Sequence, residues 1–186
     1  MCIRDSPVSL ETGRFTSKVY QLQPFDRALK DSARVSIQLK KSESAEKKGI
    51  FYYDQKAGWT YLPSKFSIVD RLLSAPLYSF EAVAVIEDTV PPRIYDFYPG
   101  QKASYSSPDF TTISGKVEDD LAGIGKDKDI QMTLDGESLY FEYHPIKKEV
   151  RYRLDGFLGI GQYQLVITAT DQVGNRSTKE ITFSVN

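Results

Sequence analysis

Apolar and polar residues alternate along most of the chain in short stretches, which is the period of a half-buried β-strand. The alternation is strict over residues 33–39, and it returns with Ile130, Met132 and Leu134. Further stretches of this kind are residues 50–53, 59–62, 111–117, 139–143, 150–154, 161–169 and 181–185. Turn residues such as Asp135 and Gly136 separate them. The pattern therefore predicts an all-β chain of antiparallel β-sandwiches.

Two adjacent prolines divide the chain within residues 87–92. Residues 77–86 are typical of a buried strand before them, and residues 93–98 begin a new strand after them. Pro91 and Pro92 each fix φ and lack a backbone donor, so neither strand continues across them. Because 186 residues suffice for two small domains, we expect two sandwiches in tandem: a β-rich domain over residues 7–88 and a second over residues 89–186.

The composition narrows the possible functions. With 40% hydrophobic and 12% aromatic residues, each half can bury a core without disulfides. The 24 Lys and Arg residues against 25 Asp and Glu give a net charge of -1, which creates no field that would attract nucleic acid or an anionic membrane. No run approaches the roughly 18 apolar residues of a membrane span. Cys2 is the only cysteine, which excludes an internal disulfide and a cysteine-built zinc site.

The first six residues stand apart from the rest. Residues 1–6 (MCIRDS) resemble the translated adapter remnant that opens many gene sequences assembled from environmental DNA. We therefore expect residues 1–6 to be an artefact and the natural protein to start earlier. On that expectation, the lack of a signal peptide at this start says nothing about localisation.

Four landmarks of the C-terminal half follow one another in the order of a bacterial immunoglobulin-like domain. They are residues 88–94 (DTVPPRI), 114–119 (SGKVED), 161–165 (GQYQL) and 169–175 (ATDQVGN). Residues 89–186 thus resemble such a domain, and the resemblance implies an extracytoplasmic module, since these domains are repeated in large exported bacterial proteins. The physical pattern agrees, because Tyr163 stands where a buried tyrosine can bond a backbone carbonyl near a strand corner.

The N-terminal half resembles a second group of proteins. Residues 49–52 (GIFY), 58–62 (GWTYL) and 77–85 (LYSFEAVAV) are similar to β-rich segments that follow the catalytic domain in exported murein metallopeptidases of the lysostaphin type. That family holds zinc with a His-x-x-x-Asp pair and a His-x-His pair, whereas this chain has one histidine. The resemblance therefore implies a C-terminal accessory region whose catalytic domain lies upstream.

The residues offer no complete catalytic set. His144 is the only histidine and so the only base for a Ser-His-Asp triad. It precedes Pro145 at a strand end, with no glycine-flanked serine elbow in the chain, which favours a surface histidine. A zinc site needs several His or Cys ligands, and the phosphate-loop motif is missing. We predict that this chain is not an enzyme.

Acidic residues gather in the loops of the C-terminal half. Hard oxygen ligands suit Ca²⁺, and Asp119, Asp120 and Asp171 end strands of opposite sheets whose ends can share one loop cluster. These three residues are the candidate metal ligands, and no other cofactor is expected. The alternative is that the aspartates bond the backbone amides of their own turns.

The aromatic residues Tyr53, Trp59 and Tyr61 are the candidates for stacking on a ligand. Burial statistics favour Trp59 as a core residue instead. The sequence predicts a non-catalytic structural or interaction module of an exported, envelope-associated bacterial protein, in the periplasm, on the outer surface or secreted. Its partner would be a cell-wall or envelope component or a neighbouring domain, and the alternative function is a carbohydrate-binding module.

Overall fold

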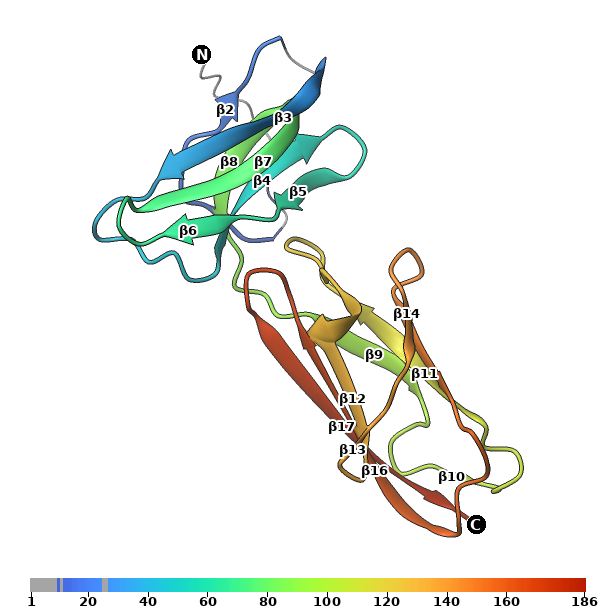
Figure 1. Cartoon of the computed structure of the whole chain (residues 1–186). Coiled ribbons are helices and arrows are strands. Elements are labelled where there is room, and N and C mark those ends of the chain that lie inside the picture. Colours follow the sequence, from blue (N-terminus) through green and yellow to red (C-terminus); the bar gives the residue numbers. More distant parts are fainter. Residues whose placement is uncertain (1–9, 11, 25–26) are drawn as a thin grey trace. The chain divides into compact units, whose positions relative to one another are not determined.

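The chain forms two compact units, seen in a computed structural model that describes residues 10, 12–24 and 27–186 (Figure 1). The suspected artefact at residues 1–6 lies outside the described residues. The first unit comprises Met1–Val90 with two loop segments, Asp120–Ala122 and Gln172–Asn175. The second comprises Pro91–Asp119, Gly123–Asp171 and Arg176–Asn186. The domain limits 7–88 and 89–186 stay a prediction.

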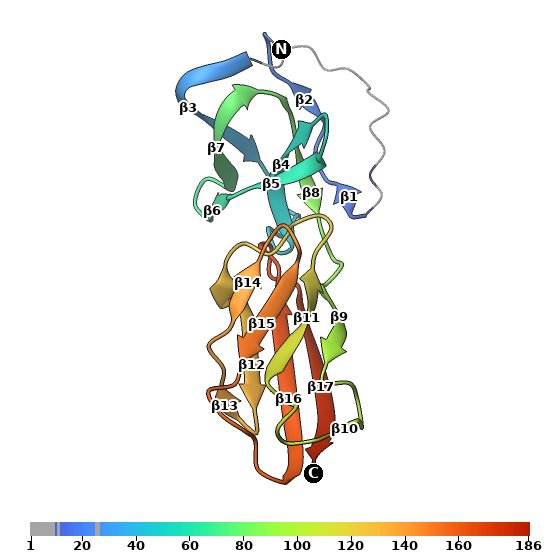
Figure 2. The ribbon, with the colours of Figure 1, turned by 90° about the vertical axis from the view of Figure 1, so that its right-hand side faces the viewer.

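The first unit contains two antiparallel sheets (Figure 2). One sheet has the order β1-β8-β4-β5, with β2 also pairing with β8, and the other has the order β3-β7-β6. The strands of the first sheet are β1 (Arg14–Phe15), β2 (Tyr20–Gln21), β4 (Lys48–Asp54), β5 (Gly58–Leu62) and β8 (Ala82–Glu87). Those of the second are β3 (Arg27–Gln38), β6 (Lys65–Ser67) and β7 (Leu72–Phe80).

Strand β8 is buried on both faces, which explains its unbroken run of apolar residues. Val83 and Val85 belong to the core that includes residues of β3 and β7. Ala84 and Ile86, on the opposite face, belong to a second core cluster with Trp59. The remaining buried members of that cluster are Phe51, Ala82, Leu121 and Ala122.

The two loop segments are held in the first unit by a buried aspartate as well as by this core. Asp88 accepts hydrogen bonds from the amides of Val90 (3.0 Å) and Ala122 (3.1 Å). Its backbone carbonyl accepts a hydrogen bond of 2.8 Å from the side-chain amide of Asn175. Asp88 and Asn175 are both buried, so these bonds satisfy polar groups that water cannot reach.

Two strand predictions for the N-terminal half were wrong in detail. Residues 77–86 form two strands rather than one, because the chain leaves β7 after Phe80 and enters β8, in the other sheet, at Ala82. The strand expected at residues 33–39 begins earlier, at Arg27, and its register with β7 shifts between Ala28 and Ala33. An apolar pattern alone does not show where a strand changes sheets.

The second unit is an immunoglobulin-like β-sandwich. One sheet has the order β14-β15-β11-β9 and the other β10-β17-β16-β12-β13. The first is built of β9 (Arg93–Tyr98), β11 (Thr112–Glu118), β14 (Glu142–His144) and β15 (Glu149–Arg153). The second is built of β10 (Ser104–Tyr105), β12 (Ile130–Leu134), β13 (Glu137–Ser138), β16 (Gly161–Thr170) and β17 (Arg176–Val185), and a short 3-10 helix, η1 (Asp127–Asp129), precedes β12.

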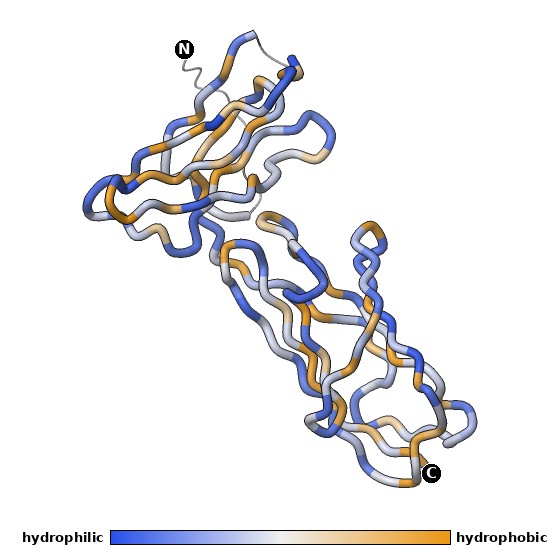
Figure 3. Tube along the Cα trace, in the orientation of Figure 1, coloured by the Kyte–Doolittle hydropathy of each residue, from blue (hydrophilic) through white to orange (hydrophobic). Residues whose placement is uncertain are grey.

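Alternating residues of both sheets form the core of the second unit, and Figure 3 shows the alternation as changes of colour along the strands. The buried members are Phe110, Ile113, Val117, Ile130, Met132, Val150, Leu165, Ile167, Ala169, Ile181, Phe183 and Val185. The predicted turn at Asp135 and Gly136 joins β12 to β13 with positive φ at both residues, 49° and 86°. Apart from the parallel pair of β10 and β17, the described strands pair antiparallel, so the all-β fold class of antiparallel sheets is confirmed.

Among the described residues, no helix is both long enough and apolar enough to cross a membrane.

Candidate functional site

The first unit contains an apolar groove of about 420 Å³ between its two sheets. Its lining includes Tyr20 and Leu22, in and just after β2, and six residues of β3. The full lining is Tyr20, Leu22, Ala33, Arg34, Val35, Ser36, Ile37, Gln38, Leu77, Phe80 and Val83. Of the lining residues that the structure describes, only Arg34 carries a charge.

Six consecutive residues of β3, 33–38, line this groove. Successive side chains of a strand point to opposite faces, so a cavity on one face would touch only every second residue. Val35 and Ile37 are the more buried residues of this stretch, whereas Arg34, Ser36 and Gln38 are exposed. The groove therefore runs along the edge of β3, where backbone groups of all six residues are within reach.

β3 is an edge strand of its sheet. In the described part of the chain it pairs with β7 alone. Arg34 lies opposite Pro76, which has no N–H to donate, and the amide of Leu39 donates to the carbonyl of Arg71. Hydrogen-bonded and non-bonded pairs alternate in an antiparallel ladder. The backbone groups of the odd-numbered residues between 33 and 39 thus bond to β7. The backbone N–H and C=O groups of Arg34, Ser36 and Gln38 consequently point to the open edge.

The opposite edge of the same sheet is protected. β6 pairs with β7 only at residues 72–74. Beyond them Pro76 interrupts the row of donors on β7, and a proline on an exposed edge disfavours pairing with a further strand. β3, in contrast, has neither proline nor glycine over its twelve residues. Of the two edges that the structure describes for this sheet, the β3 edge therefore offers an incoming strand the longer uninterrupted row of donors and acceptors.

The predicted ligand-stacking residues lie in or against a core cluster. Trp59 is 8% exposed, and its ring makes edge contacts with Phe15 (5.2 Å between centroids) and Tyr53 (5.5 Å). Tyr61 makes an edge contact with Phe51 (5.4 Å), and its hydroxyl accepts a hydrogen bond from the amide of Ser64. Tyr53 and Tyr61 are half-buried. Their role toward a ligand stays a prediction.

The structure brings together two of the three predicted metal ligands. Asp119 follows β11 and Asp171 follows β16, and carboxylate oxygens of the two lie within 4.8 Å of each other. Asp171 is buried, and Asp119 accepts a hydrogen bond of 2.6 Å from the amide of Gly123. Asp120 is exposed and belongs to a loop segment of the first unit. A pair of close carboxylates suits Ca²⁺, and the bond to Gly123 equally suits the turn-capping alternative.

Glu118, next to this pair in sequence, is engaged by two cations. Its carboxylate lies 2.5 Å from the ammonium group of Lys148 and 2.7 Å from the guanidinium group of Arg93. The hydrogen bond from Lys148 holds the pKa of Glu118 below its ordinary value, and a hydrogen bond from the Tyr95 hydroxyl acts in the same direction. This network stabilises a buried charge on the sheet, and it leaves Glu118 less suited than Asp119 to a metal ion.

His144, the only histidine, lies exposed at the end of β14. Its Nδ1 atom accepts a hydrogen bond of 3.3 Å from the amide of Lys147 within the β14–β15 turn. The ring therefore caps a turn, which agrees with the surface role expected for this residue.

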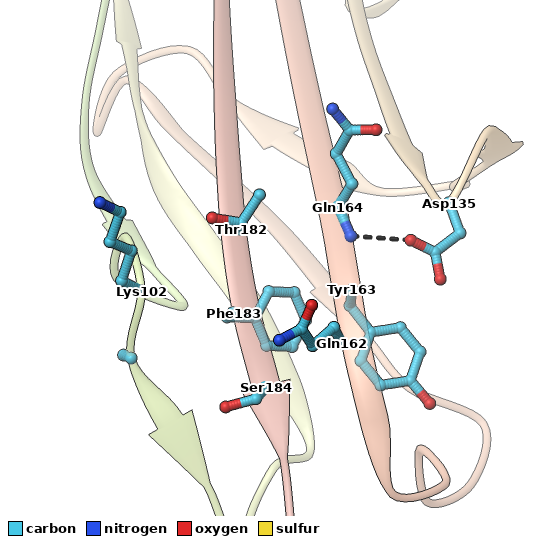
Figure 4. Close-up of a pocket in the computed structure, with 9 residues that line it drawn as sticks. Lys102, Asp135, Gln162, Tyr163, Gln164, Thr182, Phe183 and Ser184 are labelled. Atoms are coloured by element: carbon cyan, nitrogen blue, oxygen red, sulfur yellow. Dashed lines mark hydrogen bonds between the residues drawn. The ribbon is translucent and has the colours of Figure 1, made fainter.

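A polar groove of about 500 Å³ lies on the second unit (Figure 4). Residues 162–164 of β16 and 182–184 of β17 form its floor, with Lys102 and Asp135 on either side. Asp135 accepts a hydrogen bond of 2.7 Å from the amide of Gln164. The Tyr163 ring stacks on Phe183, with 5.5 Å between centroids. The groove thus offers mainly amide and hydroxyl groups.

Comparisons with known proteins add likenesses of fold. No family model matches the chain, and no curated protein sequence matches it. Among solved structures, CopC from Methylosinus trichosporium OB3b is 14% identical with a TM-score of 0.41, over 51% of this chain and 93% of that one. PcoC, a methionine-rich copper resistance protein from Escherichia coli, is 16% identical with a TM-score of 0.38, over 52% of this chain and 100% of that one. Drosophila N-cadherin EC1-4 is 13% identical with a TM-score of 0.33, over 94% of this chain and 50% of that one.

The groove beside β3 was missed by sequence reasoning. Residues 33–39 were expected to form a half-buried strand, but whether a strand lies at an edge depends on the order of strands in the sheet. The available signal was the number of exposed charges on this strand, which is unusual for a strand with neighbours on both sides.

Proposed function

We propose that this chain is a non-catalytic interaction module of an exported, envelope-associated bacterial protein, and that the groove beside β3 is its binding site for an extended polypeptide. The observation that carries the proposal is the coincidence of an apolar groove with an open strand edge along residues 33–38. Strand addition supplies affinity through main-chain hydrogen bonds, and neighbouring pockets select the side chains.

The proposal also concerns the larger protein to which this module belongs and its location. The resemblance of residues 49–52, 58–62 and 77–85 to segments of lysostaphin-type enzymes supports an accessory region of a murein metallopeptidase. The resemblance of residues 89–186 to a bacterial immunoglobulin-like domain supports an extracytoplasmic location. The engagement of His144 in a turn supports a non-catalytic role.

A selection from a library of short random peptides tests the binding function. We expect the wild-type chain to enrich peptides that do not bind the Ser36→Pro variant, because proline removes an edge N–H group without removing a backbone hydrogen bond to β7. The matched control is Ser36→Val, which loses the same hydroxyl group but keeps the N–H group. Peptides that bind the wild type and the Ser36→Pro variant equally, or no enrichment at all, would contradict the proposal.

Incubation with purified murein and zinc tests the non-catalytic part. We expect no soluble muropeptides, and release that a chelator abolishes would contradict this part.

The carbohydrate-binding alternative predicts instead that the chain sediments with protein-free murein and that Tyr53→Ala together with Tyr61→Ala abolishes sedimentation. The observation that favours this alternative is the polar groove of Figure 4, whose amide and hydroxyl groups suit hydrogen bonds to a sugar.

A further inference from the structure

We propose that the groove beside β3 selects an extended segment in which apolar and acidic residues alternate, and that this segment adds to the sheet as a new edge strand. The inference rests on the proposed function and names the class of partner. It concerns the first unit alone.

The spacing of the partner's apolar residues follows from the two sides of the groove. Ile37 belongs to the same apolar cluster as Val83 and Leu77, and Val35 packs against that cluster. Tyr20 and Leu22 also pack against that cluster and line the groove. A strand that pairs with Arg34, Ser36 and Gln38 points every second side chain to this inner face. Those positions enter an apolar groove, where burial of apolar surface is favourable.

The charge of the partner follows from the outer face. β3 carries Arg27, Lys30 and Arg34 against Asp31, a net charge of +2 from three cations and one anion, and Arg34 is the charged residue within the groove stretch 33–38. Arg34 is exposed and lines the groove. Opposite charges facing each other on neighbouring strands are stabilising, and like charges are destabilising. The remaining side chains of the added strand therefore favour Asp or Glu.

The same charges disfavour a second copy of this chain as the occupant. Two β3 strands paired edge to edge would bring two strands of net charge +2 together, with an exposed Arg34 on each. Repulsion between the two positively charged strands opposes that pairing. A partner with acidic residues meets no such repulsion.

The geometry also identifies the bonds that an incoming strand makes. The backbone groups of residues 34, 36 and 38 are directed to the open edge, whereas those of 33, 35 and 37 bond to β7. Ser36 lies at the centre of this row. Its hydroxyl group lies 2.8 Å from that of Ser74 on β7, so a replacement at residue 36 needs a control that loses the hydroxyl group alone.

The test measures the affinity of the full chain for two capped peptides of about eight residues. One alternates valine and glutamate, and the other alternates valine and lysine. We expect the glutamate peptide to bind and the lysine peptide to bind at least roughly tenfold more weakly. Ser36→Pro should weaken the binding of the glutamate peptide by roughly tenfold relative to Ser36→Val, because both variants lose the hydroxyl group but only Ser36→Pro loses the N–H group. Arg34→Glu should reverse the preference between the peptides.

The possible results separate the inference about an acidic partner from the proposed function. Equal binding of both peptides, no binding of the glutamate peptide, or binding that Ser36→Pro leaves intact would overturn the inference. If the random library still yields peptides that require the N–H group of Ser36, the proposed function stands and only the acidic pattern falls. Sedimentation equilibrium of the free chain checks for self-association, and a dimer that Ser36→Pro dissociates would overturn the choice of partner. Thermal unfolding of each variant shows whether it is folded.

Discussion

The hydroxyl group of Tyr163 donates a hydrogen bond of 2.8 Å to the backbone carbonyl of Gly159, four residues earlier in the chain. The bond ties the start of strand β16 to the loop over residues 155–160, in which Phe157 and Ile160 are exposed. The ring of Tyr163 stacks on Phe183 at the edge of the core. One side chain therefore fixes both the loop and the start of the strand.

Removal of this hydroxyl group should be measurable. We expect Tyr163→Phe to lower the free energy of unfolding by about 1 kcal/mol, because it leaves the carbonyl of Gly159 without this donor and keeps the ring. Urea denaturation is the measurement. Tyr140→Phe is the matched control, since Tyr140 is 95% exposed, and a loss of equal size in both variants would argue against a specific role for the bond.

Truncation of Trp59 should be more costly. Its ring is buried between Phe15 and Tyr53, so Trp59→Ala is expected to lower the stability of the first unit by about 3 to 5 kcal/mol. Trp59→Phe, which retains most of the ring contacts, should cost less. The exposed residue Tyr78 provides the control, as Tyr78→Ala. An unchanged denaturation midpoint in Trp59→Ala would favour a binding role for the indole.

Calcium should raise the melting temperature if the aspartates of the second unit hold it. A ligand that binds only the folded state stabilises by mass action, and at millimolar Ca²⁺ a weak site would add about 1 kcal/mol. Asp119→Asn should abolish the increase, because a carboxylate oxygen of Asp119 lies within 4.8 Å of one of Asp171, whereas Asp120→Asn should retain it, because Asp120 is exposed and is not a member of this cluster. If the wild-type melting temperature is the same with calcium and with chelator, the turn-capping role of Asp119 remains.

The stability of the second unit should depend on pH through Glu149. Hydrogen bonds from Lys116, then from Arg151, hold the pKa of Glu149 below its ordinary value. A carboxyl whose folded pKa is depressed contributes stability above its unfolded pKa and loses it as the pH falls through the folded pKa. Glu149→Gln should thus be less stable than the wild type at pH 7, and the difference should vanish in acid. Denaturation at several pH values checks this, and a difference that persists at pH 2 would contradict it.

The sequence predicted the class of the fold and most of its hairpins, because alternation and turn residues act locally. The turn at Asp135 and Gly136 and the bond from Tyr163 to a nearby carbonyl both follow from short-range rules. The break at Glu81 did not follow, since apolar residues continue from β7 into β8 while the chain changes sheets. β10 was not among the strands that the alternation predicted, because its two residues pair with β17, far away in the sequence.

The candidate site was less predictable than the fold for the same reason. The residue types of β3 were visible, but its open edge depends on the position of β7 and on the absence of another neighbour among the described strands. Asp119 and Asp171 were predicted to come close because both end strands of a sandwich, and the structure places their carboxylates together. Asp120 is not a member of this cluster, because the side chains of consecutive residues point in different directions.

The parallel pairing of β10 with β17 has a mechanical consequence. Backbone bonds join Thr182 to Lys102, Ser184 to Ala103 and Asn186 to Tyr105 along this pair. Because the strands run in the same direction, tension on Asn186 and on the residue before β10 pulls them past each other along their length. All the bonds then bear the load together, whereas a hairpin pulled open at its ends loses its bonds one after another. A force that stretches the second unit along β17 therefore loads these backbone bonds together rather than one at a time.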